Sequence, residues 1–259
     1  MDTRPPVPID TTVYDAFPSL ANLHAVVREH YPDLREPFFW DVFERNKPYT
    51  CLSVERFYNI FKSIEYIARA GIPGDIVECG VWKGGSMMAV ARVLLESGDG
   101  QRKLHLFDTI EGMSEPSAAD RSIFGESAAD LMGKEQHIKE TSHVWAYGSL
   151  NEVKQNLRMT GYDERHIAFV MGKVEDTIPT HAPERIALLR LDTDWYESTY
   201  HELTHLYPRL SVGGVLIIDD YSHWAGARKA VDQYFEENRL KLLLQRIDYT
   251  GRMCVKLEP

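Results

Sequence analysis

Apolar and polar positions follow two different periods along most of the chain. Beyond Gly71, short runs rich in Ile, Leu and Val alternate with amphipathic stretches of helical period. The short runs predict buried strands at 75–79, 103–108, 166–171, 185–192 and 214–219. The amphipathic stretches predict helices at 86–96, 150–159, 198–210 and 225–237. Strands separated by helices form βαβ units, so we expect a doubly wound α/β fold with a mainly parallel sheet.

The two ends of the chain differ from this alternating region. Near the C-terminus, segments 240–247 and 252–257 flank a turn that contains Gly251, which predicts a hairpin and an antiparallel strand. The sheet should therefore have seven strands. Residues 1–70 combine a Pro-rich, polar arm with helical patterns. We expect them to pack on a core domain formed by residues 71–259.

A long polar segment, residues 111–148, interrupts the alternation between a strand and a helix. Insertions of this length in a compact domain are usually active-site lids or binding loops, with disorder as the alternative. The segment follows the predicted strand that ends in Asp108. Because that strand should end beside a bound cofactor, we expect the insertion to form a lid over the substrate pocket.

Composition narrows the class of protein. A chain of 259 residues with 44% hydrophobic content suits one large globular domain, and a net charge of −10 argues against nucleic acid as a partner. The three cysteines, Cys51, Cys79 and Cys254, are scattered and lack metal-site spacing, which favours thiols in a reducing compartment. No apolar run is long enough to cross a membrane, and Met1-Asp-Thr-Arg-Pro-Pro lacks a signal core. We expect a cytoplasmic protein that does not bind membranes.

Two acidic pairs follow two consecutive predicted strands. Asp192 and Asp194 end one apolar run, and Asp219 and Asp220 end the next. Ligands of open α/β sheets bind beyond the carboxyl ends of the strands. Four carboxylates there would repel one another unless protons or a cation intervene. Single acids at such positions are often helix N-caps, but two successive pairs favour a site for a hard divalent ion.

The first predicted strand runs into a glycine-rich turn, Glu78-Cys-Gly-Val-Trp-Lys-Gly-Gly-Ser86. Such a turn lets a ligand approach the backbone, but its glycine spacing departs from the dinucleotide fingerprint. Glu78 would repel a pyrophosphate and could instead pair with the ammonium group of S-adenosylmethionine. Asp108, at the end of the next strand, can hold ribose hydroxyls. We therefore favour S-adenosylmethionine over a nicotinamide cofactor.

Four motifs in order resemble the macrocin O-methyltransferase family. They are the segments Glu78–Ser86, Phe107–Gly112, Leu191–Thr199 and Asp219–Asp232, each at a predicted strand end. The family methylates sugar hydroxyls of macrolide and aminocoumarin antibiotics with S-adenosylmethionine and Mg²⁺. The chain is also similar to the enediyne-pathway rhamnose O-methyltransferases of this group. The resemblance implies the class I methyltransferase fold and a sugar or glycoside acceptor, and we expect a homo-oligomer.

The resemblance also assigns roles to individual residues. Asp192, Asp219 and Asp220 match the metal ligands, and Asp194 matches the general base, with Glu197 in reserve. The positions that match cofactor contacts are Tyr49, Cys51, Glu78, Gly80, Ser86, Asp108, Lys173, Val174 and Asp192. Relatives usually have Met where Cys51 stands, so that contact departs from the family pattern. His223, Trp224, Trp82 and Trp195 could line the pocket or pack in the core.

Three alternatives remain open from the sequence. Asp192-Thr-Asp194 resembles the D-x-D motif of haloacid-dehalogenase phosphatases, although that motif belongs on the first strand and here lies far along the chain. A methyltransferase-like binding module without activity is a second possibility, which the presence of all four acids weakens. An O-methyltransferase acting on a non-sugar diol or a catechol is the third. The sequence does not separate a nucleotide sugar from a finished glycoside.

Overall fold

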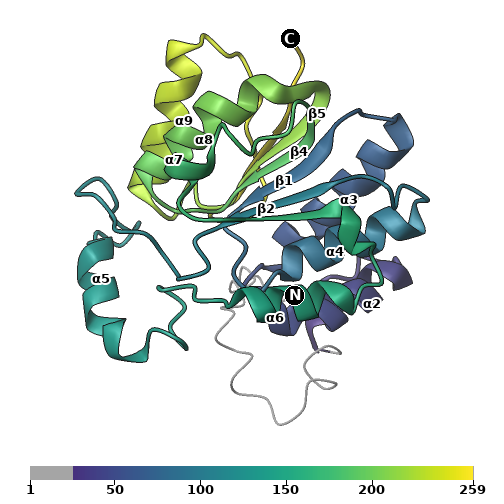
Figure 1. The fold of residues 1–259 in the computed structure, drawn as a ribbon, viewed down its shortest axis with the longest axis horizontal. Helices are drawn as coiled ribbons and strands as arrows, with labels where there is room; N and C mark the ends of the chain where they lie inside the picture. Colours follow the sequence, from purple (N-terminus) through teal and green to yellow (C-terminus); the bar gives the residue numbers. More distant parts are fainter. Residues whose placement is uncertain (1–25, 259) are drawn as a thin grey trace, which may run out of the picture.

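A single mixed sheet forms the centre of the protein in the computed structural model, which describes residues 26–258 (Figure 1). Its strands are β1 (Asp75–Cys79), β2 (Leu104–Asp108), β3 (Ile167–Met171), β4 (Ile186–Leu191), β5 (Leu210–Ile218), β6 (Gln245–Arg246) and β7 (Arg252–Val255). The strand order is β3-β2-β1-β4-β5-β7-β6, with β7 antiparallel to both of its neighbours. The predicted seven-stranded, mainly parallel sheet with a C-terminal hairpin is confirmed. The predicted arm at residues 1–12 lies outside the described residues.

Helices cover both faces of the sheet (Figure 1). One face carries α2 (Pro37–Asn46), α3 (Val54–Ala70), α4 (Gly85–Glu96) and α6 (Leu150–Arg158). The other carries α7 (Val174–Thr177), α8 (Tyr196–Leu206) and α9 (Ala225–Glu237). Because both faces are covered, every residue of β4 is buried, which explains its continuous apolar run. None of the helices in residues 26–258 has the length and apolar character needed to cross a membrane.

The helices before the sheet share its core. Ser53 accepts a hydrogen bond from the backbone N–H of Arg56 at 3.1 Å and so begins α3. The aromatic side chains Phe39, Phe57 and Phe61, from α2 and α3, are almost completely buried. Burial of each such side chain contributes about 1.5–3 kcal/mol of apolar transfer free energy. These helices are therefore part of the folded body that carries the sheet.

Several element boundaries differ from the prediction, and the first strand of the C-terminal hairpin covers only Gln245–Arg246 of the predicted segment 240–247. Helix α8 ends at Leu206 and a short 3-10 turn, Tyr207–Arg209, follows it. Pro208 has no N–H to continue the α-helical pattern, so the helix is shorter than the apolar period predicted. Strand β5 then begins at Leu210, where it pairs with Ile186 before an irregularity in the register.

The insertion at residues 111–148 is folded and lies beside the sheet (Figure 1). It contains α5 (Ala128–Glu135) and a 3-10 turn, Gln136–Ile138. Its apolar side chains form a small cluster with Trp195 and Trp224, at the beginnings of α8 and α9. The structure thus shows a packed segment, in contrast to the disordered alternative.

The strand register brings three strand ends to the same level. Cys79 of β1 pairs with Leu191 of β4, which pairs with Ile218 of β5. The next residues continue this alignment, because the N–H of Asp192 donates to the carbonyl of Cys79 and the N–H of Asp219 donates to that of Leu191, each at 2.9 Å. The strand order reverses between β1 and β4, because β2 and β3 follow on one side of β1 whereas β4 and β5 follow on its other side. Ligands of doubly wound sheets bind at this point.

Candidate active site

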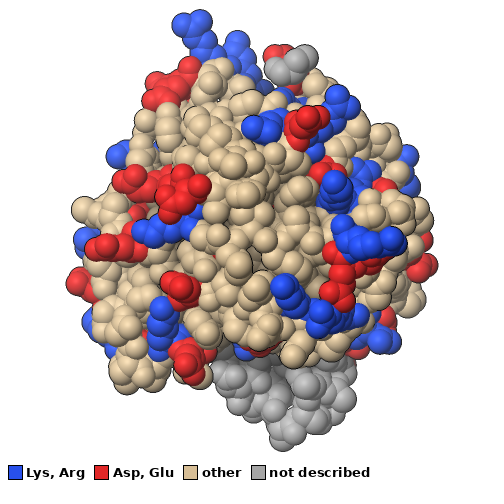
Figure 2. Space-filling model, viewed as in Figure 1, with Lys and Arg blue, Asp and Glu red and all other residues tan. Residues whose placement is uncertain are grey.

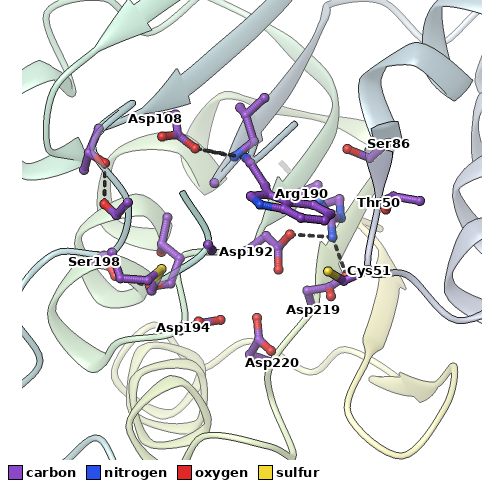
Figure 3. Close-up of a pocket in the computed structure, with 18 of the residues that line it drawn as sticks. Thr50, Cys51, Ser86, Asp108, Arg190, Asp192, Asp194, Ser198, Asp219 and Asp220 are labelled. Atoms are coloured by element: carbon purple, nitrogen blue, oxygen red, sulfur yellow. Dashed lines mark hydrogen bonds and ion pairs between the residues drawn. The ribbon is translucent and has the colours of Figure 1, made fainter. Parts of the chain in front are cut away.

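A cavity of about 760 Å³ opens beyond the carboxyl ends of these strands (Figure 3). The predicted site residues that line it are Cys51, Gly80, Ser86, Asp108, Lys173, Val174, Asp192, Asp194, Asp219 and Asp220. The N-terminal segment, the insertion and the turn between β6 and β7 complete its wall. Segments far apart in the sequence therefore meet around one cavity.

The glycine-rich turn after β1 is closely packed against its neighbours. A Cβ atom at Gly80, where φ is +84°, would overlap the carbonyl oxygen of Asp192. A Cβ atom at Gly85 would lie 2.5 Å from the carbonyl oxygen of Tyr49. Tyr49 does not line the cavity, because its backbone packs against the beginning of α4 instead. The glycines are thus required by the close approach of two other segments.

Asp108 connects the turns that follow β1 and β2. Its carboxylate accepts backbone hydrogen bonds from Val81 at 2.7 Å, Trp82 at 3.2 Å and Ile110 at 2.6 Å. Burial raises the pKa of Asp108, while these hydrogen bonds oppose the shift. The side chain holds the cavity wall in shape, and its predicted contact with ribose stays a prediction.

Glu78 lies inside the sheet and does not line the cavity. Its Oε1 atom accepts hydrogen bonds from Ser86 Oγ and Arg190 Nη1, both at 2.5 Å. Burial raises the pKa of Glu78 despite the opposing charge of Arg190. Its Oε2 atom has no hydrogen-bond partner among the described residues. The predicted contact with a methionine ammonium stays a prediction, and in this structure Glu78 orients Ser86 and Arg190.

The other predicted cofactor contacts also line the cavity. Cys51 lines it from the N-terminal segment, where its Sγ atom lies 3.6 Å from Nδ1 of His143 in the insertion. Lys173 and Val174 line it at the beginning of α7. The cavity is therefore bordered by both regions to which the family resemblance assigned cofactor contacts.

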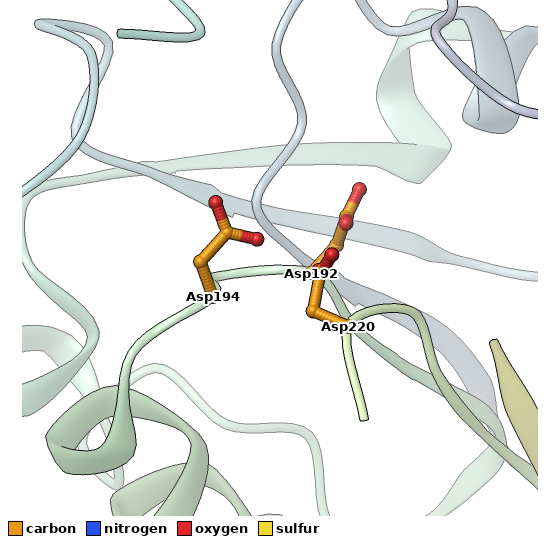
Figure 4. Close-up of side chains that lie close together, drawn as sticks. All are labelled: Asp192, Asp194 and Asp220. Carbon is orange, nitrogen blue, oxygen red and sulfur yellow. The ribbon is translucent and has the colours of Figure 1, made fainter. Parts of the chain in front are cut away.

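Asp192, Asp194 and Asp220 converge at the strand ends (Figure 4). One oxygen atom from each carboxylate lies within 4.8 Å of the others. Burial, together with neighbouring acids, raises the pKa values of Asp192 and Asp220 well above the ordinary range, and burial raises the pKa of Asp194 to about 7. Asp220 Oδ2 is buried without a hydrogen-bond partner among the described residues. Arg190 balances Asp192 alone among these three acids, so a cluster of closely spaced carboxylate oxygens with one guanidinium group fits a hard divalent ion.

Asp219 is placed differently from the other three acids. It forms ion pairs with Arg56 and with Arg190, the latter at 2.8 Å. Burial would raise the pKa of Asp219, but the two guanidinium groups together lower it. The structure therefore gathers Asp192, Asp194 and Asp220, whereas the family resemblance implied Asp192, Asp219 and Asp220 as ligands.

Arg190 was not among the predicted site residues. Its side chain is only 3% exposed and contacts Glu78 at 2.5 Å, Asp192 at 2.6 Å and Asp219 at 2.8 Å. The available signal was an arginine inside an apolar strand, because a buried charge requires a partner. We expected protons or a cation to separate the acids, and the structure adds guanidinium groups as a third answer.

Arg56 provides the second guanidinium group, from α3. It contacts Asp219 on one side and Asp248, in the β6–β7 turn, at 2.9 Å on the other. Ser53 Oγ also donates to Asp248, at 2.8 Å. No local pattern marked Arg56, because its partners are separated from it by more than 160 residues. The N-terminal helices thus contribute a charged group directly to the site.

The remaining wall comes from the loop after β5, the hairpin turn and the insertion. His223, Trp224 and Tyr249 line the cavity, and the Tyr249 hydroxyl lies 3.5 Å from Nδ1 of His223. Trp195 packs against Trp224 with ring centroids 5.0 Å apart and does not line the cavity. The reserve base, Glu197, is exposed and also lies outside it. Asp194 is thus the better placed of the two candidate bases.

Comparisons with known proteins agree with this architecture. The model of the macrocin-O-methyltransferase (TylF) family matches residues 40–256. The chain is 34% identical over 244 residues to an 8-demethyl-8-(2,3-dimethoxy-alpha-L-rhamnosyl)-tetracenomycin-C 4'-O-methyltransferase of Streptomyces olivaceus, covering 94% of this chain and 84% of the relative. It is 32% identical over 186 residues to the demethyldecarbamoylnovobiocin O-methyltransferase of Streptomyces niveus, covering 72% of this chain and 67% of the relative.

Solved structures show the same fold. The O-methyltransferase NovP superposes with a TM-score of 0.69 at 31% identity, covering 81% of this chain and 83% of NovP. The calicheamicin methyltransferase CalS11 superposes with a TM-score of 0.63 at 17% identity, covering 98% of this chain and 94% of CalS11. The likeness to NovP favours methyl transfer over the phosphatase alternative. The chain therefore belongs to the macrocin O-methyltransferase family and is an O-methyltransferase.

Proposed function

We propose that this enzyme transfers a methyl group from S-adenosylmethionine to a deoxysugar hydroxyl, on a glycoside or a nucleotide sugar, with the assistance of Mg²⁺. One observation carries the proposal: the carboxylate cluster lies in the same cavity as the glycine-rich turn. Two relatives add support, because their names specify O-methylation of a rhamnosyl tetracenomycin and of demethyldecarbamoylnovobiocin.

The cofactor half of the cavity suits S-adenosylmethionine. The turn through Gly80 and Gly85 brings the cofactor close to the backbone at the beginning of α4, where Ser86 lies. Asp108 is the proposed contact for the ribose hydroxyls, and Lys173 and Val174 are the proposed border of the adenine. Cys51 closes the cavity from the N-terminal side.

The acid half suits the acceptor and a divalent ion. Asp192 and Asp220 are the ligands that the geometry favours, and Asp219 completes the proposed set if it is released from Arg56. When bound, such an ion supplies positive charge that favours ionisation of the acceptor hydroxyl. Asp194 remains the proposed general base, because its carboxylate lies beside Asp192 and Asp220 at the acid end of the cavity. Burial raises its pKa to about 7, and a bound cation would lower that pKa, so the ion would supply most of the acidification of the hydroxyl.

The methyl transfer then follows from the positions proposed for the two substrates and for Asp194. The acceptor oxygen attacks the sulfonium methyl in line, its proton passes to an Asp194 oxygen, and the neutral thioether of S-adenosylhomocysteine leaves. Residues of the insertion, including Met113 and Val144, line the cavity. We propose that the insertion acts as a lid that excludes water from this step. Hydrogen exchange across residues 111–148 should then fall when both substrates bind, and equal exchange in both states would contradict the lid.

An acceptor screen tests the function. Purified enzyme with S-adenosylmethionine and Mg²⁺ is incubated with rhamnosylated aromatic polyketides, macrolide glycosides, nucleotide deoxysugars and a catechol. Mass spectrometry should show the gain of one methylene on a sugar-bearing compound, and its loss in chelator. Methylation of the catechol alone would favour the alternative acceptor class. Failure to bind S-adenosylmethionine in calorimetry would rule out methyl transfer.

We further propose that the enzyme works as a cytoplasmic homo-oligomer. All three cysteines are free thiols, and Cys79 and Cys254 are buried, which suits a reducing compartment. On the face shown in Figure 2, acidic and basic residues are interspersed. The oligomeric state stays a prediction. Light scattering of the purified protein tests it, and a monomeric mass at working concentration would contradict it.

A further inference from the structure

A buried carboxyl group that the proposed reaction does not use lies behind the acid cluster. Glu202, on α8, is completely inaccessible to solvent. Its Oε1 atom accepts a hydrogen bond from Thr193 Oγ1 at 2.9 Å. Thr193 stands between Asp192, a proposed metal ligand, and Asp194, the proposed base. A side chain that contacts neither reactant is thus connected to the segment that carries both acids.

The surroundings of Glu202 favour its neutral form. Burial raises its pKa well above the ordinary range, and the charges of Glu175 and Asp192 act in the same direction. Hydrogen bonds from Thr193 and from the Cys79 thiol oppose the shift without reversing it. Within the described residues, Glu202 has no arginine or lysine partner of the kind that Glu78 has in Arg190. Glu202 therefore acts as a hydrogen-bonding acid rather than as one member of an ion pair.

The segment that it holds has an unusual backbone. Asp194 has a φ of +67°, in the left-handed region that residues other than glycine rarely adopt. Such conformations persist where surrounding contacts determine them. Thr193 is fixed on two sides, because its carbonyl accepts the N–H of Trp195 at 2.8 Å while its hydroxyl donates to Glu202. The hydroxyl contact ties this turn to α8 through the Thr193 side chain, in addition to the longer hydrogen bond that Ser198 Oγ of α8 donates to the Thr193 carbonyl at 3.4 Å.

We propose that Glu202 is a positioning residue, which accepts the Thr193 hydrogen bond and so holds the 192–194 turn with Asp192 and Asp194 facing the same point in the cavity. The proposal rests on the proposed function, since it gives those two acids their roles. In a purely structural role, Glu202 would only support the fold. In the proposed role, loss of its hydrogen bond to Thr193 weakens cation binding and lowers turnover even when the fold and the cofactor site are intact.

Isosteric variants separate these possibilities. Thr193→Val removes the hydroxyl at nearly constant volume, and Thr193→Ser retains it. Glu202→Leu removes the acceptor, whereas Glu202→Gln keeps an acceptor oxygen without the carboxylic acid. Thr199→Val is the matched control. Thr199 is a buried threonine on α8, the helix that carries Glu202, and its side chain does not line the cavity. Thermal unfolding verifies that each variant is folded.

Two quantities are measured. Calorimetry gives the Mg²⁺ affinity of the protein saturated with S-adenosylhomocysteine, and steady-state kinetics give kcat and the KM for S-adenosylmethionine. Loss of groups that orient metal ligands typically costs roughly 10- to 100-fold in affinity or activity, so we expect that loss in Thr193→Val and Glu202→Leu. The KM for S-adenosylmethionine should change little. Thr193→Ser, Glu202→Gln and Thr199→Val should behave like the wild type.

The outcomes distinguish the positioning role from the proposed function. A folded Thr193→Val protein with wild-type Mg²⁺ affinity and kcat overturns the positioning role, whether or not Glu202→Leu folds. Glu202→Gln as impaired as Glu202→Leu, beside a normal Thr193→Val, also overturns it. If the wild type itself binds no divalent ion, the proposed metal site fails and the positioning role fails with it.

Discussion

The two halves of the cavity are built in different ways. The cofactor half is shaped by backbone: the turn through Gly80 and Gly85 fits so closely against neighbouring segments that no Cβ atom is tolerated. The acid half is shaped by charged side chains from separate elements, among them Arg56 of α3, Arg190 of β4 and Asp219 after β5. The first half should be sensitive to added volume, and the second to any change of charge, even at constant volume.

The largest effect should come from removing one charge in the acid half. Asp194→Asn preserves side-chain volume, so we expect metal and cofactor binding to persist while kcat falls by roughly 10²- to 10⁴-fold, the usual scale for loss of a general base. Steady-state kinetics and calorimetry on the same preparation measure both. Glu197→Gln is the control, because Glu197 lies outside the cavity. Near-normal turnover in Asp194→Asn would mean that the proton leaves by another route.

Removing Arg190 should affect the whole fold. Arg190→Met fills a similar volume but leaves Glu78 and Asp219 buried with less balancing charge. Breaking a buried ion pair on one side typically costs about 3–5 kcal/mol, and we expect a loss of that size in the free energy of unfolding. Urea denaturation measures it. Arg158→Met is the matched control, since the Arg158–Glu164 pair is exposed and should contribute little. Equal midpoints for the two variants would contradict this account of the acid half.

Removal of the Asp108 carboxylate, in the cofactor half, should weaken cofactor binding rather than the fold. Asp108→Ala loses the proposed hydrogen bonds to ribose and also releases the N–H groups of Val81, Trp82 and Ile110. Hydrogen bonds to a charged group contribute about 1.5–3 kcal/mol, so the dissociation constant for S-adenosylmethionine should rise roughly 10- to 150-fold. Calorimetry measures it, with Mg²⁺ affinity as the internal comparison. An unchanged dissociation constant would remove Asp108 from the cofactor site.

The smallest effect is a dependence of cation binding on pH. The pKa of Asp194 is raised to about 7, above its ordinary value, so below neutral pH a proton occupies the acid cluster. A cation favours the ionised form, so protons should be released on binding and the Mg²⁺ affinity should fall as pH drops through 7, by at most about tenfold per pH unit for one proton. Calorimetry in two buffers of different ionisation enthalpy counts the protons. Asp194→Asn should reduce the number of protons released, because the raised pKa values of Asp192 and Asp220 make those two acids the other sources. An unchanged number of released protons would assign the step to them.

Several features followed from local sequence because their causes are local. Apolar runs of strand length predicted the parallel strands, because a strand covered on both faces must be apolar on both sides. Parallel strands share one carboxyl edge, so the acids after β4 and β5 were expected to meet there, and Asp192, Asp194 and Asp220 do. The glycine-rich turn was recognisable because its glycines lie close together in the sequence, although Gly80 is required by the approach of the distant Asp192. In each case the pattern that reveals the feature lies within a few positions of the chain.

Other features were decided only when distant segments came together. The apolar pattern did not indicate that Arg56 would reach Asp219, nor that Arg190 would pair with both Asp192 and Asp219. The left-handed backbone of Asp194 and the contact between Thr193 and Glu202 are equally invisible in a list of residue types. Charges and hydrogen bonds act on whatever lies within a few ångströms, and the neighbours of a buried charge depend on how the whole chain folds. The sequence alone therefore determined the sheet and which acids gather at its edge, whereas the tertiary structure decided how each acid is partnered.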